Sequence, residues 1–103
     1  NIMPGAVILA GSIITGNSLI KRNAVIGPNS EIIDSVVGED SKVRFSVVVN
    51  SSIGNNVSVG PFAHIRENSI VGDHNRIGNF VEMKGNVIEV DYAKTNNYEK
   101  IIR

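Results

Sequence analysis

Aliphatic residues recur at every sixth position along most of the chain, and this period constrains the fold more than any other feature. The first six slots all hold isoleucine, and after two slips of register the pattern resumes and continues to a methionine. The slots are Ile2, Ile8, Ile14, Ile20, Ile26 and Ile32, then Val37 and Val43, then Val47, Ile53, Val59, Ile65, Val71, Ile77 and Met83. A period of six fits neither an α-helix, with about 3.6 residues per turn, nor the alternation of a simple strand. We therefore interpret each hexad as a short strand followed by a turn.

Small residues and glycines accompany the aliphatic slots. A small residue stands two positions before most of them: Ala6, Ser12, Ser18, Ala24, Ser30, Ser35, Ser41, Ser51, Ala63 and Ser69. Hexapeptide repeats of this kind build a parallel β-helix, in which about three hexads form one triangular coil of about 18 residues. We predict an all-β protein in which residues 1–88 form a left-handed parallel β-helix of about five coils, an exception to the usual right-handed crossover. The alternative is a β-sandwich with glycine-rich turns.

The two register slips and the C-terminal residues depart from the hexad pattern. The slips fall near residues 33–36 and 44–52, where a shortened turn or a bulge has to absorb each missing residue. On this register Val36, Phe45, Val48 and Val49 point outward, and we expect them at an interface with another chain because a single prism would leave them in water. After Met83 the next inward slot is Glu89, so we expect residues 89–103 to form a cap or tail, with a short amphipathic helix over 92–103.

Composition excludes several classes of function. Ten basic residues balance ten acidic ones and form no polybasic run, so we expect no nucleic-acid partner. Pro4, Gly5 and Gly11 interrupt the uncharged N-terminal stretch, so we expect no membrane span. No basic segment precedes a compact apolar one, so we expect no signal peptide. We expect a cytoplasmic protein. The chain has no cysteine and only two histidines, ten residues apart, so we expect no metal site. Because the first residue is Asn, we expect the chain to be processed or cut from a longer protein.

Three segments resemble one enzyme family. GPFAHIR (60–66), IGNFVEMK (77–84) and, less distinctively, IGPNSEIIDSVVG (26–38) are similar to the acetyltransferase domain of the bifunctional bacterial glucosamine-1-phosphate N-acetyltransferase/N-acetylglucosamine-1-phosphate uridylyltransferase. The resemblance covers about residues 1–84. It implies a homotrimer of β-helices that moves an acetyl group from acetyl-CoA to glucosamine 1-phosphate in the synthesis of UDP-N-acetylglucosamine for the cell envelope. The family's uridylyltransferase domain, which uses Mg²⁺, has no counterpart in this sequence.

The resemblance implies that Arg66 and Lys84 bind the sugar phosphate. Their separation of 18 residues, one full coil, places them on the same corner and on neighbouring strands. Arginine offers a planar fork of donors and lysine a compact charge, a combination that suits a phosphate. The alternative is that both are solvated corner residues that pair with Glu67 and Glu82.

The sequence also departs from the family where catalysis would occur. Glu67 replaces the proline that usually follows the motif arginine. When AKTNNYEK (93–100) is matched to the family with one inserted residue, Asn97 falls at the position of the general-base histidine. An amide does not accept a proton at neutral pH, and the coils that form the acetyl-CoA groove are absent, so we assign no catalytic, cofactor-binding or metal residue. Two hypotheses remain. The chain is a piece or relative of the acetyltransferase, inactive in isolation, or it is a truncated, non-catalytic trimeric scaffold or sugar-phosphate-binding homologue.

Overall fold

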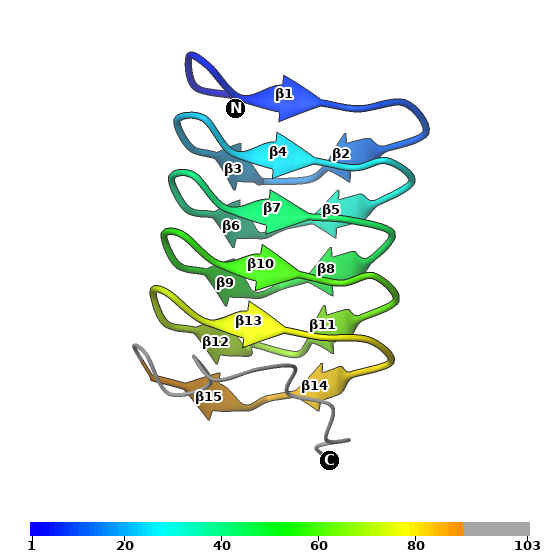
Figure 1. The fold of residues 1–103 in the computed structure, drawn as a ribbon, viewed down its shortest axis with the longest axis vertical. Helices are drawn as coiled ribbons and strands as arrows, with labels where there is room; N and C mark the ends of the chain where they lie inside the picture. Colours follow the sequence, from blue (N-terminus) through cyan, green and yellow to red (C-terminus); the bar gives the residue numbers. More distant parts are fainter. Residues whose placement is uncertain (90–103) are drawn as a thin grey trace.

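The hexads wind into a left-handed parallel β-helix, which a computed structural model describes for residues 1–89. Figure 1 shows the chain descending from β1 to β15. Strands such as β4, β7 and β10 cross the front to the right, and the chain returns to the left behind them, which is a left-handed path. The predicted fold class is confirmed. No helix within these residues is long and apolar enough to cross a bilayer.

Every third strand belongs to the same sheet, so the structure contains three five-stranded parallel sheets. The first sheet contains β1 (Val7–Ile8), β4 (Val25–Ile26), β7 (Lys42–Val43), β10 (Ser58–Val59) and β13 (Arg76–Ile77). The second sheet contains β2 (Ile13–Thr15), β5 (Glu31–Ile33), β8 (Val47–Val49), β11 (His64–Arg66) and β14 (Glu82–Lys84). The third sheet contains β3 (Leu19–Ile20), β6 (Val36–Val37), β9 (Ser52–Ile53), β12 (Ile70–Val71) and β15 (Val87–Ile88). We call the turns from first to second sheet the first corner, from second to third the second corner, and from third to first the third corner.

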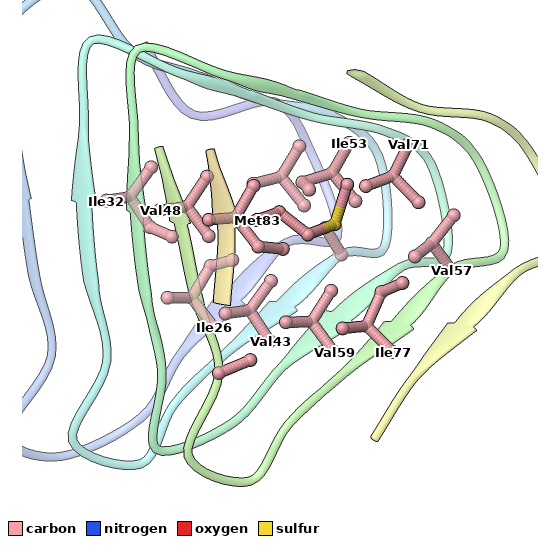
Figure 2. Close-up of a cluster of buried hydrophobic side chains, with 14 of the residues drawn as sticks. Ile26, Ile32, Val43, Val48, Ile53, Val57, Val59, Val71, Ile77 and Met83 are labelled. Atoms are coloured by element: carbon pink, nitrogen blue, oxygen red, sulfur yellow. The ribbon is translucent and has the colours of Figure 1, made fainter. Parts of the chain in front are cut away.

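The aliphatic slots point into the prism and form its core, as the period predicts. Figure 2 shows side chains from all three sheets, including Ile26, Val48 and Ile53, meeting in the interior. From Ile20 to Met83 the inward side chains are almost completely buried. The first coil lies at an open end, so Ile2 keeps half of its surface exposed although its backbone pairs with Ile20.

The predicted register is wrong at two slots, and the first is Val47. Val48, not Val47, points inward and is fully buried, while Val47 is half-buried on the outer face. Val48 pairs with Ile32 above it and Ile65 below it. The sequence analysis placed successive inward residues four positions apart, at Val43 and Val47. The structure instead has two corners in which the inward residues are five positions apart, Val43 to Val48 and Val48 to Ile53. The shortened turns fall within the two segments that the sequence marked as irregular, but Val48 is not the outward residue we expected.

The second wrong slot is Glu89, because a further shortened corner at the C-terminal side escaped the sequence analysis. Ile88 is buried and pairs with Val71, whereas Glu89, the expected inward residue, is exposed. Five residues rather than six separate Ile88 from Met83. The expected cap or tail over 89–103, with its helix over 92–103, lies outside the described residues from position 90 onward.

Left-handed backbone conformations define the corners. Residues with positive φ stack from coil to coil, and at the first corner the column is Gly11, Asn29, Phe45, Phe62 and Phe80. Phenylalanine is a costly choice at such a φ, because its Cβ crowds the backbone. The three rings contact one another, with centroids 5.9 Å apart for Phe45 and Phe62 and 5.5 Å apart for Phe62 and Phe80. Phe80 is the most exposed of the three, at 71%. The first corner thus presents an aromatic column to solvent.

The small residues that precede the inward slots do more than make room for a tight turn. At the second corner each serine hydroxyl accepts a hydrogen bond from the backbone N–H of the next coil. This serine ladder runs from Ser18 through Ser35, Ser51 and Ser69 to the N–H of Asn86, with N···O distances of 3.0–3.2 Å. A shorter ladder at the first corner links Ser12, Ser30 and Ser46 to the N–H of Ala63. The hydroxyls satisfy buried backbone groups that the strands leave unpaired.

Candidate functional site

Arg66 and Lys84 stand side by side, as their 18-residue separation predicts. Arg66 ends β11 and Lys84 ends β14, and the two residues are direct partners in the register of these parallel strands. Each follows a fully buried residue, Ile65 or Met83, and strand alternation therefore turns both side chains outward. The second sheet thus places two cations at the C-terminal ends of adjacent strands, where the second corner begins.

Two carboxylates already accompany these cations. The Arg66 guanidinium donates from Nε and Nη2 to Glu82 Oε2, at 3.0 and 2.7 Å. Its third contact runs from Nη1 to Glu67 Oε2 at 3.2 Å, and Glu67 Oε1 lies 4.0 Å from Lys84 Nζ. The four side chains carry two positive and two negative charges. The ion pairs named as the alternative to a phosphate site are therefore present.

The position of Glu67 follows from the length of its corner. The second corner is one residue longer between Ile65 and Val71 than in the coils directly before and after it, where five residues separate the inward slots. Glu67 and Asn68 fill the longer turn, and both have positive φ, 59° and 64°. The Gly85 N–H below donates to the Arg66 carbonyl, and a Cβ built on Gly85 would have the Glu67 carbonyl oxygen as its nearest neighbour, at 3.4 Å. Gly85 itself carries no side chain that could come between Glu67 and Lys84.

A shallow groove of about 260 Å³ lies on the other side of the same corner, and the sequence analysis did not identify it. Its walls come from the second corner and the start of the third sheet: Asp34, Asn50, Ser51, Ser52, Asn68, Ser69 and Ile70. Two shortened corners lie above the longer one that carries Asn68. The signal that could have found the groove is this run of short, short and long spacings between inward slots. Its lining contains a carboxylate and no lysine or arginine.

The two histidines lie apart. His64 is on the outer face of β11, and His74 occupies the third corner between β12 and β13. Across residues 1–89 no group of three or more His, Cys, Asp or Glu side chains is placed to hold a metal ion.

The fold and the repeat identify a hexapeptide-repeat β-helix domain. Comparison with known proteins then identifies its relatives. The chain belongs to the family described as the GMPPB C-terminal domain, whose model matches residues 1–101. Over 38 residues it is 60% identical to the bifunctional protein GlmU of Caldanaerobacter subterraneus subsp. tengcongensis, 55% to that of Clostridium beijerinckii and 47% to that of Bacillus subtilis. In each case the match covers 37% of this chain and 8% of the relative. The resemblance to the bifunctional family is thereby confirmed, over a short stretch.

The solved structures that the chain matches include the crystal structure of the CcmM N-terminal domain in complex with CcmN, with a TM-score of 0.37 and 17% sequence identity. The match covers 90% of this chain and 88% of that one.

Proposed function

We propose that this chain is a relative of the acetyltransferase domain that acetylates glucosamine 1-phosphate, and that it carries the part of the site that holds the sugar phosphate. The observation that supports this most is the pairing of Arg66 with Lys84 in the register of β11 and β14, within a chain similar to the bifunctional GlmU proteins. With Nε and Nη2 of Arg66 bonded to Glu82, Nη1 can donate to one phosphate oxygen, and the Lys84 ammonium suits a second. Lys84 keeps 46% of its side-chain surface exposed and Arg66 keeps 32%, so an anion can reach both.

We further propose that these 103 residues alone do not turn over substrate. The family position of the general base falls on Asn97, and neither histidine of the chain is at that position. The groove beside Asp34 does not suit the phosphates of acetyl-CoA, because it offers a carboxylate and no cation. The base and the acetyl-CoA site would therefore come from residues outside this sequence, and we derive no acetyl-transfer step here.

Acetyl transfer and sugar-phosphate binding test the two parts of the proposal separately. We expect the chain to release no free thiol from acetyl-CoA in the presence of glucosamine 1-phosphate. We expect it to bind glucosamine 1-phosphate in a calorimetric or NMR titration, and Lys84→Ala to weaken this binding about tenfold, because it removes one of two charged contacts.

Lys42→Ala is the matched control, since Lys42 is exposed on β7 of the first sheet, and its affinity should equal that of the parent chain. Equal affinities for Lys84→Ala and the parent would contradict the phosphate site. Thiol release by the parent that Lys84→Ala loses would contradict the inactivity.

A non-catalytic trimeric scaffold is the second candidate, and exposed apolar residues favour it. Two of the residues expected at an interface, Val36 and Val49, are half-buried on the outer faces of β6 and β8. The aromatic column lies along the first corner. A single prism leaves these surfaces in water, which favours association. Sedimentation equilibrium should give a mass of three chains, and the mass of one chain at all concentrations would contradict the scaffold.

A further inference from the structure

We infer that Glu67 is an internal substitute for phosphate, which an anion must displace from Arg66 and Lys84 before it binds. This inference rests on the proposed sugar-phosphate site and deepens it. One carboxylate oxygen of Glu67 faces Arg66 Nη1 at 3.2 Å, and the other faces Lys84 Nζ at 4.0 Å. A carboxylate that contacts both cations through its two oxygens occupies the position that a bridging phosphate would take.

The two carboxylates of the cluster have different roles. Glu82 accepts two hydrogen bonds from the Arg66 guanidinium, the shorter at 2.7 Å, and only 28% of its side-chain surface is exposed. Glu67 makes longer contacts, and half of its side chain is in water. Exposed ion pairs of this kind contribute little stability. Glu82 therefore holds the fork in place, and Glu67 is the carboxylate that can leave.

The net charge of the cluster determines which anions can replace Glu67. With Glu82 in place, Arg66 and Lys84 retain one net positive charge, which Glu67 neutralises. An anion of charge minus one, such as a phosphodiester, gains no charge interaction by replacing Glu67. A terminal phosphomonoester is close to a dianion at pH 8 and gains from the exchange. The site in this chain thus takes terminal phosphomonoesters, and because displacement of Glu67 weakens every ligand, singly charged anions bind very weakly.

Titration of methyl phosphate and dimethyl phosphate at pH 8, followed by NMR of the Lys84 and Gly85 backbone amides, tests the inference. In the parent chain we expect measurable binding of methyl phosphate and very weak binding of dimethyl phosphate. Glu67→Gln should tighten both by about the same factor, roughly tenfold, because displacement of one carboxylate costs every ligand the same amount. Glu31→Gln, which removes an equal charge from β5 of the same sheet, should change either affinity less than about twofold.

Three outcomes separate the possibilities. Unchanged affinity in Glu67→Gln, with loss of binding in Lys84→Ala, overturns the role of Glu67 and leaves the phosphate site standing. A much larger gain for methyl phosphate than for dimethyl phosphate overturns displacement, since it shows that Glu67 stays in place and repels by charge alone. Absence of methyl phosphate binding in the parent and in Glu67→Gln overturns the proposed site and this inference together.

Discussion

Aspartate in place of Val48 should unfold the protein, whereas aspartate in place of Val47 should leave it folded. Val48 is fully buried between Ile32 and Ile65 in an apolar cluster whose aliphatic side chains cannot donate a hydrogen bond to a carboxylate. Burying an unpaired charge costs several kcal/mol, which is comparable to the whole stability of a small domain, about 5–15 kcal/mol. Val47 points outward beside Glu31 and His64, so the new carboxylate stays hydrated and only repels Glu31 weakly.

Far-ultraviolet circular dichroism and urea unfolding of the two variants give the comparison. We expect no β signature for Val48→Asp at 25 °C and a loss of no more than about 1 kcal/mol for Val47→Asp. The opposite order would restore the register that places Val47 inside. Because the two substitutions are identical and adjacent, differences in charge or helix and strand propensity cannot account for the result.

Alanine in place of Gly60 should destabilise the protein far more than alanine in place of Gly85. Both glycines have positive φ, 97° and 70°, so each substitution carries the strain of a left-handed backbone, about 1–2 kcal/mol. A Cβ at Gly60 would also overlap the Arg44 carbonyl oxygen and the Ser46 hydroxyl in the coil above. These atoms belong to the backbone and to the first-corner ladder, so they cannot move without breaking contacts between coils. At Gly85 the nearest atom is at an ordinary contact distance of 3.4 Å.

Chemical denaturation should show a loss of about 1–2 kcal/mol for Gly85→Ala and more than about 3 kcal/mol for Gly60→Ala. Equal losses would mean that backbone strain alone decides both positions. In that case the close approach of the fourth coil to Arg44 would contribute nothing.

The period of six predicts the β-helix because each coil repeats the same chemical requirement, an aliphatic residue inside and a small residue beside it. The period cannot decide which residue points inward where neighbouring residues satisfy that requirement equally well. Val47, Val48 and Val49 are three consecutive valines, and hydrophobicity cannot choose among them. The choice is made by Ser46, which takes the small slot two positions before Val48 and accepts the Ala63 N–H. Ile88 is a different case, because hydrophobicity favours it over Glu89, and the error came from extending the six-residue period past a five-residue corner.

The candidate site shows a similar division. The spacing of 18 predicts that Arg66 and Lys84 are neighbours, because full coils preserve register. The orientation of Glu67 depends on one extra residue in a corner flanked by shorter ones. To predict it, the register of three coils must be known at once. Sequence reasoning named Glu67 and Glu82 as alternative partners, but it could not say which cation each would contact or that Glu67 would contact both.

The serine ladder of the second corner has a consequence for how such a chain can grow. Each hydroxyl serves the backbone of the coil that follows, so every coil is completed by a side chain from its predecessor. A duplicated or deleted unit preserves these bonds only when it begins and ends at equivalent serines, which means whole coils. At the first corner the chain of hydroxyls stops at Ala63, and there the rings of Phe62 and Phe80 stack. Lengthening by partial repeats would leave buried amides unbonded along one edge, and this favours whole coils as the units of insertion and loss.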